Sequence, residues 1–451
     1  MKKRELIEIT IDKMNFGGIS STIVEDKTVE IKGGITGQRA KVLIKKVRKE
    51  KAEGKILEVL ERSSIETEAT CPHYGFCGGC SMLSVPYEKQ VDIKSNQLKE
   101  LFDDAGFSEI DYLGVKSSPK STEYRNKMEY TFGDMSKGGE LTLGMHVKNQ
   151  SFGVITTDEC KLVSPDFNKI LKTTLDYFSD KNLPYYRVMP RAGYLRHLVL
   201  RRGENTGDII VNLVTTTQAE FDLTEWTNLI SGLELEGKVV GVLHTLNDSF
   251  SDIVQCDKLE VLYGQDFFSE KVLGLNFKVS PFSFLQTNTR GSETLYSLVR
   301  EWIGTKEGRT VFDLYSGTGT IGQVMSPIAK EVIGIEIVEE AVEMAKDNAK
   351  LNGLENCTFI AGDVTEEVGK LKERPDLIIL DPPRAGIHPR GLMDIISFDA
   401  KELIYVSCNP KALMNDLKVL TGRGYKIIKA QGVDMFPNTP HCEAVVKLEK
   451  N

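Results

Sequence analysis

The sequence contains no long apolar run. A transmembrane helix needs about 20 consecutive, mostly apolar residues, and no such stretch occurs among the 451 residues. The first residues, MKKRELIEITIDK, are charged and lack the apolar segment of a secretion signal. We therefore expect a cytoplasmic protein that binds no membrane, and we expect it to be a monomer.

Cysteine is sparse, and the chain has no excess of positive charge. Eight cysteines in a chain of this length, without a secretion signal, do not indicate a disulfide scaffold. The net charge of −8 gives no reason to expect nucleic-acid binding. Residues 1–60, however, carry 14 Lys and Arg against 9 Asp and Glu, which leaves −13 for the rest. This asymmetry indicates a basic region that meets a polyanion or, alternatively, a solvated charged face.

Alternating apolar and polar positions with glycine turns predict a small β-barrel over residues 1–60. Its last strands carry a basic stripe that could follow a phosphate backbone: Lys41, Lys45, Lys46, Arg48, Lys49 and Lys51. A helix is expected over about 88–105, ending at Gly106, and a strand-rich region with a helix near 165–179 follows over about 120–275.

The segment 187–202 is rich in arginine within this strand-rich region. It holds five arginines, His197 and Tyr194, and it has no acidic residue. Guanidinium groups bind phosphates and aromatic rings stack on bases, so the pattern predicts a surface for single-stranded RNA. The alternative is an edge strand with a charged outer face.

From about residue 276 strand and helix patterns alternate, which predicts a mostly parallel, doubly wound sheet. The segments 425–436 and 441–450 are close in sequence and predict an antiparallel pair at the edge of this sheet. The first strand leads into Gly317-Thr-Gly319-Thr-Ile-Gly322, and Glu336 ends the second strand. A glycine loop with a following carboxylate suits either NAD or S-adenosylmethionine.

The sequence Asp381-Pro-Pro-Arg384 after the fourth strand favours S-adenosylmethionine. An acidic residue followed by two prolines at this place resembles the substrate side of many methyltransferases, and dehydrogenases do not need it. Together with the glycine loop, Glu336 and Asp363, this pattern predicts a methyltransferase rather than a simple loop stop.

Cys408 follows the next strand, at the edge where α/β sheets bind ligands. Methylation of uracil at C5 requires such a thiol, because a thiolate that adds to C6 makes C5 nucleophilic. A base must then remove the C5 proton, and Glu443 on the last strand is the best candidate. Cys442 is the competing thiol, but alternation along the strand directs it to the opposite face. The alternative for Cys408 is a buried, inert thiol.

Five blocks of the chain resemble the bacterial RNA (uracil-5-)-methyltransferase family, in the family's order: SPFSFLQTNTRGSETLY, DLYSGTGTIG, DPPRAG, YVSCNP and DMFPNTPHCE. The resemblance implies Cys408 as nucleophile and Glu443 as proton acceptor. It also implies a set of residues that bind S-adenosylmethionine: Gln286, Tyr315, Thr320, Glu336, Asp363 and Asp381.

The resemblance further implies three domains in a multi-domain α/β protein. These are an RNA-binding TRAM barrel of OB type (1–62), a central α+β domain (63–275) and a Rossmann-like class I methyltransferase domain (276–451). The helix near 88–105 is expected to pack on the catalytic domain. Arg125 and Lys127 are further RNA-binding candidates by resemblance.

Four cysteines form a second candidate centre: Cys71, Cys77, Cys80 and Cys160. Four thiolates can hold zinc or an iron–sulfur cluster. The uneven spacing departs from paired zinc motifs, and the resemblance points to a [4Fe–4S] cluster of the family's ribosomal branch. Unrelated thiols are the alternative.

The expected substrate is a uridine in a loop of 23S ribosomal RNA, because a target base must leave its stack and does so most easily in a loop. The barrel and the cysteines favour this branch over tRNA. Three rival functions remain open: the same reaction on tRNA, a 5-methylcytidine enzyme, and a non-catalytic RNA-binding protein with a methylase scaffold.

Overall fold

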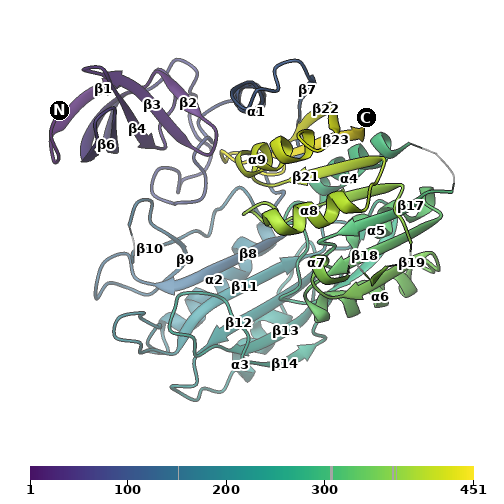
Figure 1. The fold of residues 1–451 in the computed structure, drawn as a ribbon. Helices are drawn as coiled ribbons and strands as arrows, with labels where there is room; N and C mark the ends of the chain where they lie inside the picture. The colour runs from purple at the N-terminus through teal and green to yellow at the C-terminus, as the bar shows by residue number, and fades with distance from the viewer. Residues whose placement is uncertain (151, 305–307, 368–369, 372) are drawn as a thin grey trace. The chain divides into compact units, whose positions relative to one another are not determined.

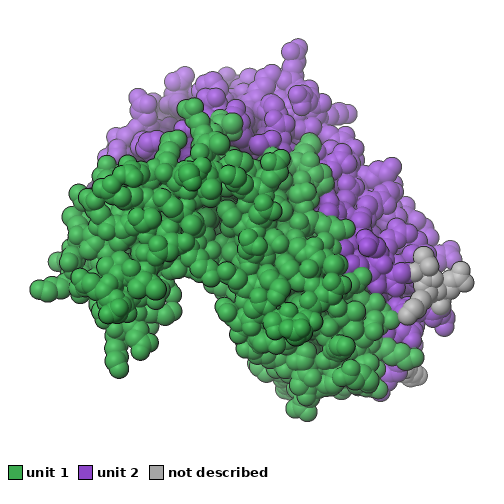
Figure 2. Space-filling view, turned by 90° about the horizontal axis from the view of Figure 1, so that it is seen from above, with its two compact units in different colours: residues 1–70, 80–121, 379–451 green, residues 71–79, 122–378 purple. Residues whose placement is uncertain are grey.

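The computed structural model describes residues 1–150, 152–304, 308–367, 370–371 and 373–451. These residues form two compact units (Figure 2). Unit 1 comprises Met1–Thr70, Cys80–Ser121 and Ile379–Asn451, and unit 2 comprises Cys71–Gly79 and Thr122–Ile378. A multi-domain α/β chain is thereby confirmed. The boundaries at 62 and 275 stay a prediction, since the two units divide the chain elsewhere.

Unit 1 begins with a six-stranded sheet in the order β1-β5-β6-β4-β3-β2. Its strands are β1 (Leu6–Thr10), β2 (Lys13–Asn15), β3 (Ile19–Val24), β4 (Lys27–Lys32), β5 (Arg39–Val47) and β6 (Lys51–Glu61). Alternate residues of β5, namely Ala40, Val42 and Ile44, are fully buried. They join apolar side chains of the other strands in one small core, as the period-two pattern of the sequence requires.

The C-terminal part of unit 1 contains four strands in the order β21-β23-β22-β7. They are β21 (Glu402–Ser407), β23 (Glu443–Lys450), β22 (Tyr425–Val433) and β7 (Asp111–Lys116). The predicted antiparallel pairing of β22 with β23 is confirmed, but its predicted place at the edge is wrong. Strand β7 lies outside β22 and runs parallel to it, so a strand from the first third of the chain forms this edge.

Three helices belong to this part of unit 1: α1 (Tyr87–Asp104), α8 (Pro389–Ser397) and α9 (Pro410–Thr421). Helix α1 ends just before Gly106, whose φ of 90° no ordinary residue adopts easily. Its buried Lys94 donates to Asp434 Oδ1 at 2.8 Å, and neither side chain is exposed to solvent. Gln90 donates to Asn438 Oδ1 at 2.9 Å. Helix α1 therefore packs on the C-terminal segment that follows β22.

Unit 2 contains a seven-stranded sheet in the order β10-β9-β8-β11-β12-β13-β14. The strands are β8 (Lys127–Gly133), β9 (Thr142–His146), β10 (Val154–Thr156), β11 (Leu195–Arg202), β12 (Asp208–Thr215), β13 (Lys238–Leu246) and β14 (Lys258–Gly264). Figure 1 labels the helices α2 (Pro165–Ser179) and α3 (Thr224–Ser231) of this unit. They pack together, and the ring centroids of Phe178 and Trp226 are 6.1 Å apart. The predicted helix over 165–179 is confirmed.

The rest of unit 2 holds the first half of the predicted α/β series. Strands β17 (Thr310–Leu314), β18 (Glu331–Glu336) and β19 (Cys357–Ala361) are parallel neighbours. The helices are α4 (Thr289–Ile303), α5 (Thr320–Met325), α6 (Glu339–Leu351), α7 (Val364–Glu367) and the 3₁₀ turn η1 (Ser326–Ile328). Strands β15 (Phe268–Val272) and β16 (Leu275–Val279) form a hairpin, and the chain passes to unit 1 within β20 (Leu377–Leu380).

Within the described ranges, every helix is too short or too polar to span a membrane.

Candidate active site

Cys408 and Glu443 lie at the ends of two paired strands of unit 1. In the antiparallel pair of β21 and β23, Ser407 is opposite Ala444. The next pair in this register is Cys408 with Glu443, and side chains directly opposite each other lie on one face. Cys408 is half-buried and Glu443 is 3% exposed. A thiol and a carboxyl group thus share one end of the sheet.

Burial and the charge of neighbouring carboxylates favour the protonated form of the carboxyl groups in this site. The pKa of Glu443 is raised to about 8, first by burial and then by the charge of the nearby Asp381, while Arg384 lowers it. Burial also raises the pKa of Asp381 to about 7. Carboxyl groups in such surroundings hold a proton near neutral pH, which makes each of them a potential proton donor or acceptor.

The thiol of Cys408 is subject to the same field. Burial raises its pKa to about 11, followed by the charges of Glu443 and Asp381, while the charge of Arg384 and a hydrogen bond from it lower the pKa. The Asn409 side chain donates to the Arg384 carbonyl oxygen at 2.8 Å and holds that segment beside Cys408. The sequence alone assigns Arg384 no part in the thiol chemistry. Its signal was a cation three residues after Asp381, at the same sheet edge.

Cys442 is a buried thiol of a different kind. It is 1% exposed, and its Sγ lies 3.5 Å from the Val433 carbonyl oxygen and 3.3 Å from that of Glu443. Burial raises its pKa far above the usual range for a thiol. These contacts leave Cys408 as the more accessible thiol of the two.

The glycine loop of unit 2 is tied to the end of β18 by Glu336. One carboxylate oxygen of Glu336 accepts from the Gly317 amide at 3.0 Å, and the other accepts from the Val338 amide at 3.0 Å. Tyr315 and Gly319 take φ angles of 65° and 71° in this turn. The loop is therefore shaped in advance, with a carboxylate at the strand end where a ribose can be bound.

Close packing explains two of the glycines. A Cβ on Gly319 would lie 2.5 Å from the ring of Phe359, and one on Gly322 would lie 2.8 Å from Asp313 Oδ2. The Gly322 amide also donates to that oxygen at 2.8 Å. These contacts fit a cofactor loop whose backbone must approach both the next strand and a ligand.

The other predicted cofactor residues are placed less uniformly. Gln286 is 9% exposed. The nearby Phe284 carbonyl oxygen accepts from Thr318 of the glycine loop at 3.3 Å, so its segment reaches the loop. Thr320 is buried, with its hydroxyl 3.3 Å from that of Thr318. Asp363 is exposed and accepts from the Thr365 amide at 2.7 Å, as a helix-capping residue does.

Three of the four predicted metal ligands lie in unit 2. Burial, followed by the charges of Cys71 and Cys77, raises the pKa of Cys160 to about 11. Cys80 belongs to unit 1. In the part of the chain that the structure describes, no group of three or more His, Cys, Asp or Glu side chains is placed to hold a metal ion. The iron–sulfur cluster therefore stays a prediction from the sequence.

Segment 187–202 was predicted to form an RNA-binding surface. This prediction is wrong for strand β11, which makes up the second half of the segment. Strand β11 lies between β8 and β12, so the edge-strand alternative is wrong as well. Arg196 and Arg201 are each 1% exposed. Arg196 donates to the Asn247 and Ser249 carbonyl oxygens at 2.8 Å, and Arg201 donates to the Ser280 carbonyl oxygen at 2.8 Å. These guanidinium groups satisfy buried backbone carbonyls, which explains arginine in a central strand.

Part of the predicted basic stripe lies on the surface of unit 1. Lys45, Lys46, Arg48, Lys49 and Lys51 are exposed, whereas Lys41 is half-buried. Several of these cations have acidic neighbours. Lys51 Nζ lies 2.9 Å from Glu30 Oε1, and Arg48 Nη2 lies 3.7 Å from Glu53 Oε1.

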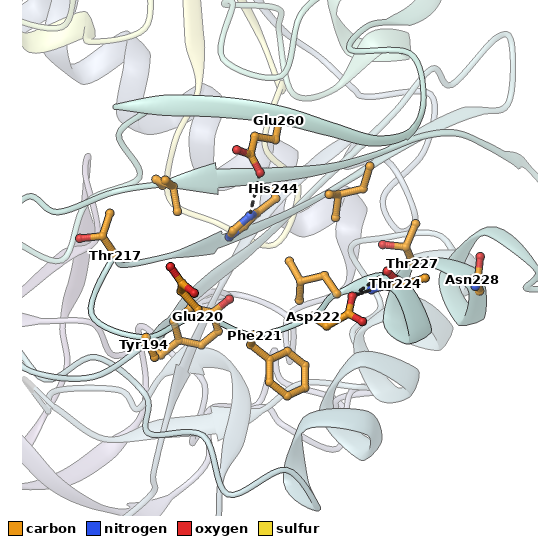
Figure 3. A pocket seen from close by; sticks show the side chains of 14 residues that line it. Tyr194, Thr217, Glu220, Phe221, Asp222, Thr224, Thr227, Asn228, His244 and Glu260 are labelled. Atoms are coloured by element: carbon orange, nitrogen blue, oxygen red, sulfur yellow. Dashed lines mark hydrogen bonds and ion pairs between the residues drawn. The ribbon is translucent and has the colours of Figure 1, made fainter.

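Unit 2 also has a cavity of about 560 Å³ whose lining includes Tyr194 but none of the predicted catalytic, cofactor-binding or metal-binding residues (Figure 3). Its lining includes the carboxylates of Glu220, Asp222 and Glu260 and the ring of His244, whose Nδ1 lies 3.8 Å from Glu260 Oε2. Among the described residues that line it, none is a lysine or an arginine. Its acidic lining does not suit RNA.

Comparison with known proteins places these features in context. The sequence model of the tRNA (uracil-5-)-methyltransferase family matches residues 86–451. Relatives described as RNA methyltransferases are 54% identical in Clostridium tetani and 50% identical in Clostridium acetobutylicum, each alignment covering 100% of this chain and 99% of the relative. The crystal structure of Pyrococcus abyssi tRNA (uracil-54, C5)-methyltransferase with S-adenosyl-L-homocysteine is 26% identical, with a TM-score of 0.75. That alignment covers 98% of this chain and 100% of that one.

Proposed function

The chain belongs to the tRNA (uracil-5-)-methyltransferase family, and on that premise we propose that Cys408 and Glu443 are its catalytic pair. The protein is an RNA (uracil-5-)-methyltransferase that uses S-adenosylmethionine. The proposal concerns which residues perform the reaction and which RNA is the substrate.

S-Adenosylmethionine supplies an electrophilic methyl group. In the proposed reaction, the Cys408 thiol releases its proton to solvent and its sulfur adds to C6 of uracil, which moves the C5–C6 electron pair into an enolate over C5 and the C4 oxygen. C5 takes the methyl group. Glu443 as a carboxylate then removes the C5 proton, the C5–C6 double bond re-forms, and the sulfur leaves C6. The products are 5-methyluridine, S-adenosylhomocysteine and one proton.

Arg384 has a defined part in this proposal. Both Cys408 and Glu443 must ionise during the cycle, yet burial and mutual repulsion oppose the ionisation of each. The guanidinium of Arg384 lowers the pKa of both groups. It thereby compensates a negative charge that moves between sulfur and carboxylate.

One observation carries the assignment. The register that puts Ser407 opposite Ala444 aligns Cys408 with Glu443, while Cys442 is enclosed by backbone carbonyls. A nucleophile and a proton acceptor at the same end of two paired strands can react with C6 and C5 of the same base.

The test of the pair uses RNA that contains 5-fluorouridine. A base cannot remove fluorine from C5 as it removes a proton, so the last step is blocked. The Cys408 adduct should therefore persist and shift the protein in a denaturing gel. Cys408→Ala should lose both the adduct and 5-methyluridine formation. Cys256→Ala, which removes an exposed thiol, should retain both. An adduct with Cys408→Ala would refute the assignment, and unchanged methylation would favour a scaffold role for this thiol.

For the substrate we propose a loop uridine of 23S ribosomal RNA, supported by the basic N-terminal sheet and the expected branch of the family. tRNA is the second candidate, because the similar P. abyssi protein is a tRNA (uracil-54, C5)-methyltransferase. To decide between them, purified protein and S-adenosylmethionine are incubated in parallel with unmodified 23S RNA and with unmodified tRNA. Each RNA is then analysed for 5-methyluridine. Product in the tRNA sample alone would overturn the ribosomal assignment, and 5-methylcytidine would overturn uracil as the target.

A [4Fe–4S] cluster held by the four cysteines is proposed only on the sequence pattern and the mutual influence of Cys71, Cys77 and Cys160. Iron and sulfide analysis of anaerobically purified protein tests it. About four of each per chain are expected, and their absence would overturn the proposal. No step of the reaction above depends on the cluster.

A further inference from the structure

Unit 1 contains a cavity of about 530 Å³ that joins its N-terminal sheet to helix α9. Strands β3, β4 and β6 supply most of the lining, including the polar side chains of Ser21, Thr28 and Lys32. The C-terminal part contributes Lys411. Seen from above, unit 1 is hollowed between its N-terminal sheet and its C-terminal segments (Figure 2).

A smaller neighbouring cavity of about 140 Å³ extends this hollow along the sheet. The two cavities share Glu30 and Glu53, and the smaller one adds Lys46, Arg48 and Lys51. Together they present five cations and two carboxylates. We call the two adjoining cavities the groove; a lining with a net positive charge attracts a polyanion, even on a chain whose total charge is negative.

The two carboxylates of the groove already have cationic neighbours. Glu30 lies 2.9 Å from Lys51 Nζ, and Glu53 lies 3.9 Å from Lys46 Nζ. Lys32 and Lys411 are exposed, and within the described residues neither forms an ion pair. These two lysines therefore remain available to an anion from outside the chain.

Lys411 connects the groove to the proposed catalytic pair. It lies on the first turn of α9, three residues after Cys408, and its ammonium would be 3.9 Å from a Cβ built on Gly17. The adjacent Gly18 abuts Pro440, since a Cβ there would be 2.9 Å from Pro440 Cγ. Pro440 precedes Glu443 by three residues. The turn at Gly17 and Gly18 thus borders both segments that carry the pair.

We propose that Lys32 and Lys411 bind a backbone phosphate of the substrate RNA close to the target uridine, and that the groove holds the adjoining strand. The proposal rests on the proposed function and adds a positioning role for these two lysines. Ammonium groups are point charges suited to phosphate, and the lining hydroxyls can donate to ribose or phosphate oxygens. The side chains act on where the strand lies and not on the chemical step.

The test compares Lys32→Gln, Lys411→Gln and the control Lys418→Gln in the full-length protein. Lys418 is exposed on the same helix as Lys411, but it is outside both cavities. Methylation of one RNA is measured at several salt concentrations. Each groove variant should raise KM about fivefold with little change in kcat and should lower the log–log salt slope by about 0.7. Lys418→Gln should match the wild type.

Single methylphosphonate substitutions along the RNA locate the phosphate. In the wild type, one neutral linkage near the target should weaken binding, and the same substitution should cost Lys411→Gln little, because the contact is already lost. Equal KM values for all four proteins would overturn the groove while leaving the proposed function intact. An equal loss in the Lys418→Gln control would overturn it too, because general charge would then explain the effect. A wild type that forms no 5-methyluridine would overturn the proposed function as well.

Discussion

At the scale of single residues, the ionisation of Cys408 and Glu443 is coupled through their shared surroundings. The charge of Glu443 raises the pKa of Cys408, the charge of Asp381 raises the pKa of both groups, and Arg384 lowers both. The free enzyme therefore holds both groups protonated near neutral pH. The reaction needs one negative charge at a time, and this coupling favours states with one charge over states with two.

The rate should rise with pH as Glu443 ionises, because only the carboxylate accepts the C5 proton. We expect the rise in kcat to centre near the pKa of about 8. Arg384→Met should move it to higher pH by about one unit. Arg390→Met, which removes an exposed arginine of α8, is the control and should leave the profile unchanged. A pH–rate profile that is identical in Arg384→Met and the wild type would contradict this role of Arg384.

Glu443 should also make stability depend on pH. Its pKa is raised in the folded state, so its contribution to stability is complete below the unfolded value of 4.5 and is lost as pH rises to about 8. Glu443→Gln removes this loss. Relative to the wild type, the variant should gain free energy of unfolding between these pH values, on the order of 5 kcal/mol above pH 8. Urea unfolding at a series of pH values measures the difference, and a constant offset would exclude the mechanism.

Arg201 makes a structural contribution that RNA binding does not share. Arg201→Met would remove the donor that Arg201 supplies to the Pro281 carbonyl oxygen and one of two donors to the Ser280 carbonyl oxygen, and it should destabilise unit 2 by about 3 kcal/mol. Arg191→Met, at an exposed arginine of the preceding loop, should change stability by less than about 1 kcal/mol, the value of an exposed cation–π contact such as the one it makes with Phe250. Thermal unfolding compares the two. Equal stability with weaker RNA binding in Arg201→Met would restore the surface interpretation.

At the scale of elements, local patterns predicted what local physics determines. The helices over 87–104 and 165–179 follow from apolar periodicity, and the strands of the α/β series follow from short apolar runs between glycines. The burial of Arg196 and Arg201 could not be predicted. Charged side chains are ordinarily exposed, and their carbonyl partners come from segments about 50 and 80 residues further along the chain.

The same limit applies to the site and to the sheet edge. Cys408 and Glu443 were identified because the chemistry demands a thiol and a base after particular strands. Their electrostatic partner Arg384 depends on side-chain placement that spacing does not give. Strand β7 pairs with β22 from more than 300 residues away. No periodicity within Asp111–Lys116 indicates that partner.

Helix α1 is held by a fully buried ion pair between Lys94 and Asp434. Lys94→Met would leave the Asp434 carboxylate buried without its cation and should destabilise unit 1 by about 3–5 kcal/mol. Lys99→Met on the same helix removes a half-buried partner of the exposed Asp103 and should cost less than about 1 kcal/mol. Denaturant unfolding of both variants tests this. The double variant Lys94→Met/Asp434→Leu should recover much of the loss, and a failure to recover would show that the pair is not the cause.

At the scale of the whole molecule, the sequence boundaries do not isolate a complete sheet. A fragment of residues 276–451 would contain β22 and Asp434 but not β7 and Lys94. We expect this fragment to aggregate for two reasons. The edge of β22 would have no partner strand, and Asp434 would have lost the cation that pairs with it. Fusion of residues 80–121 to it should restore solubility, as analytical size exclusion would show. A soluble, monomeric 276–451 fragment would refute the dependence.

The edge strand β7 has a consequence for synthesis on the ribosome. Its partner β22 is translated about 300 residues later, so at typical elongation rates α1 and β7 wait roughly 15–60 s before that strand exists. During this interval the apolar face of α1 and the unpaired edge of β7 can contact only the nascent chain, chaperones or the ribosome itself. A premature stop between these segments would therefore release an aggregation-prone chain and not a smaller folded protein, and a pause there would prolong the exposure.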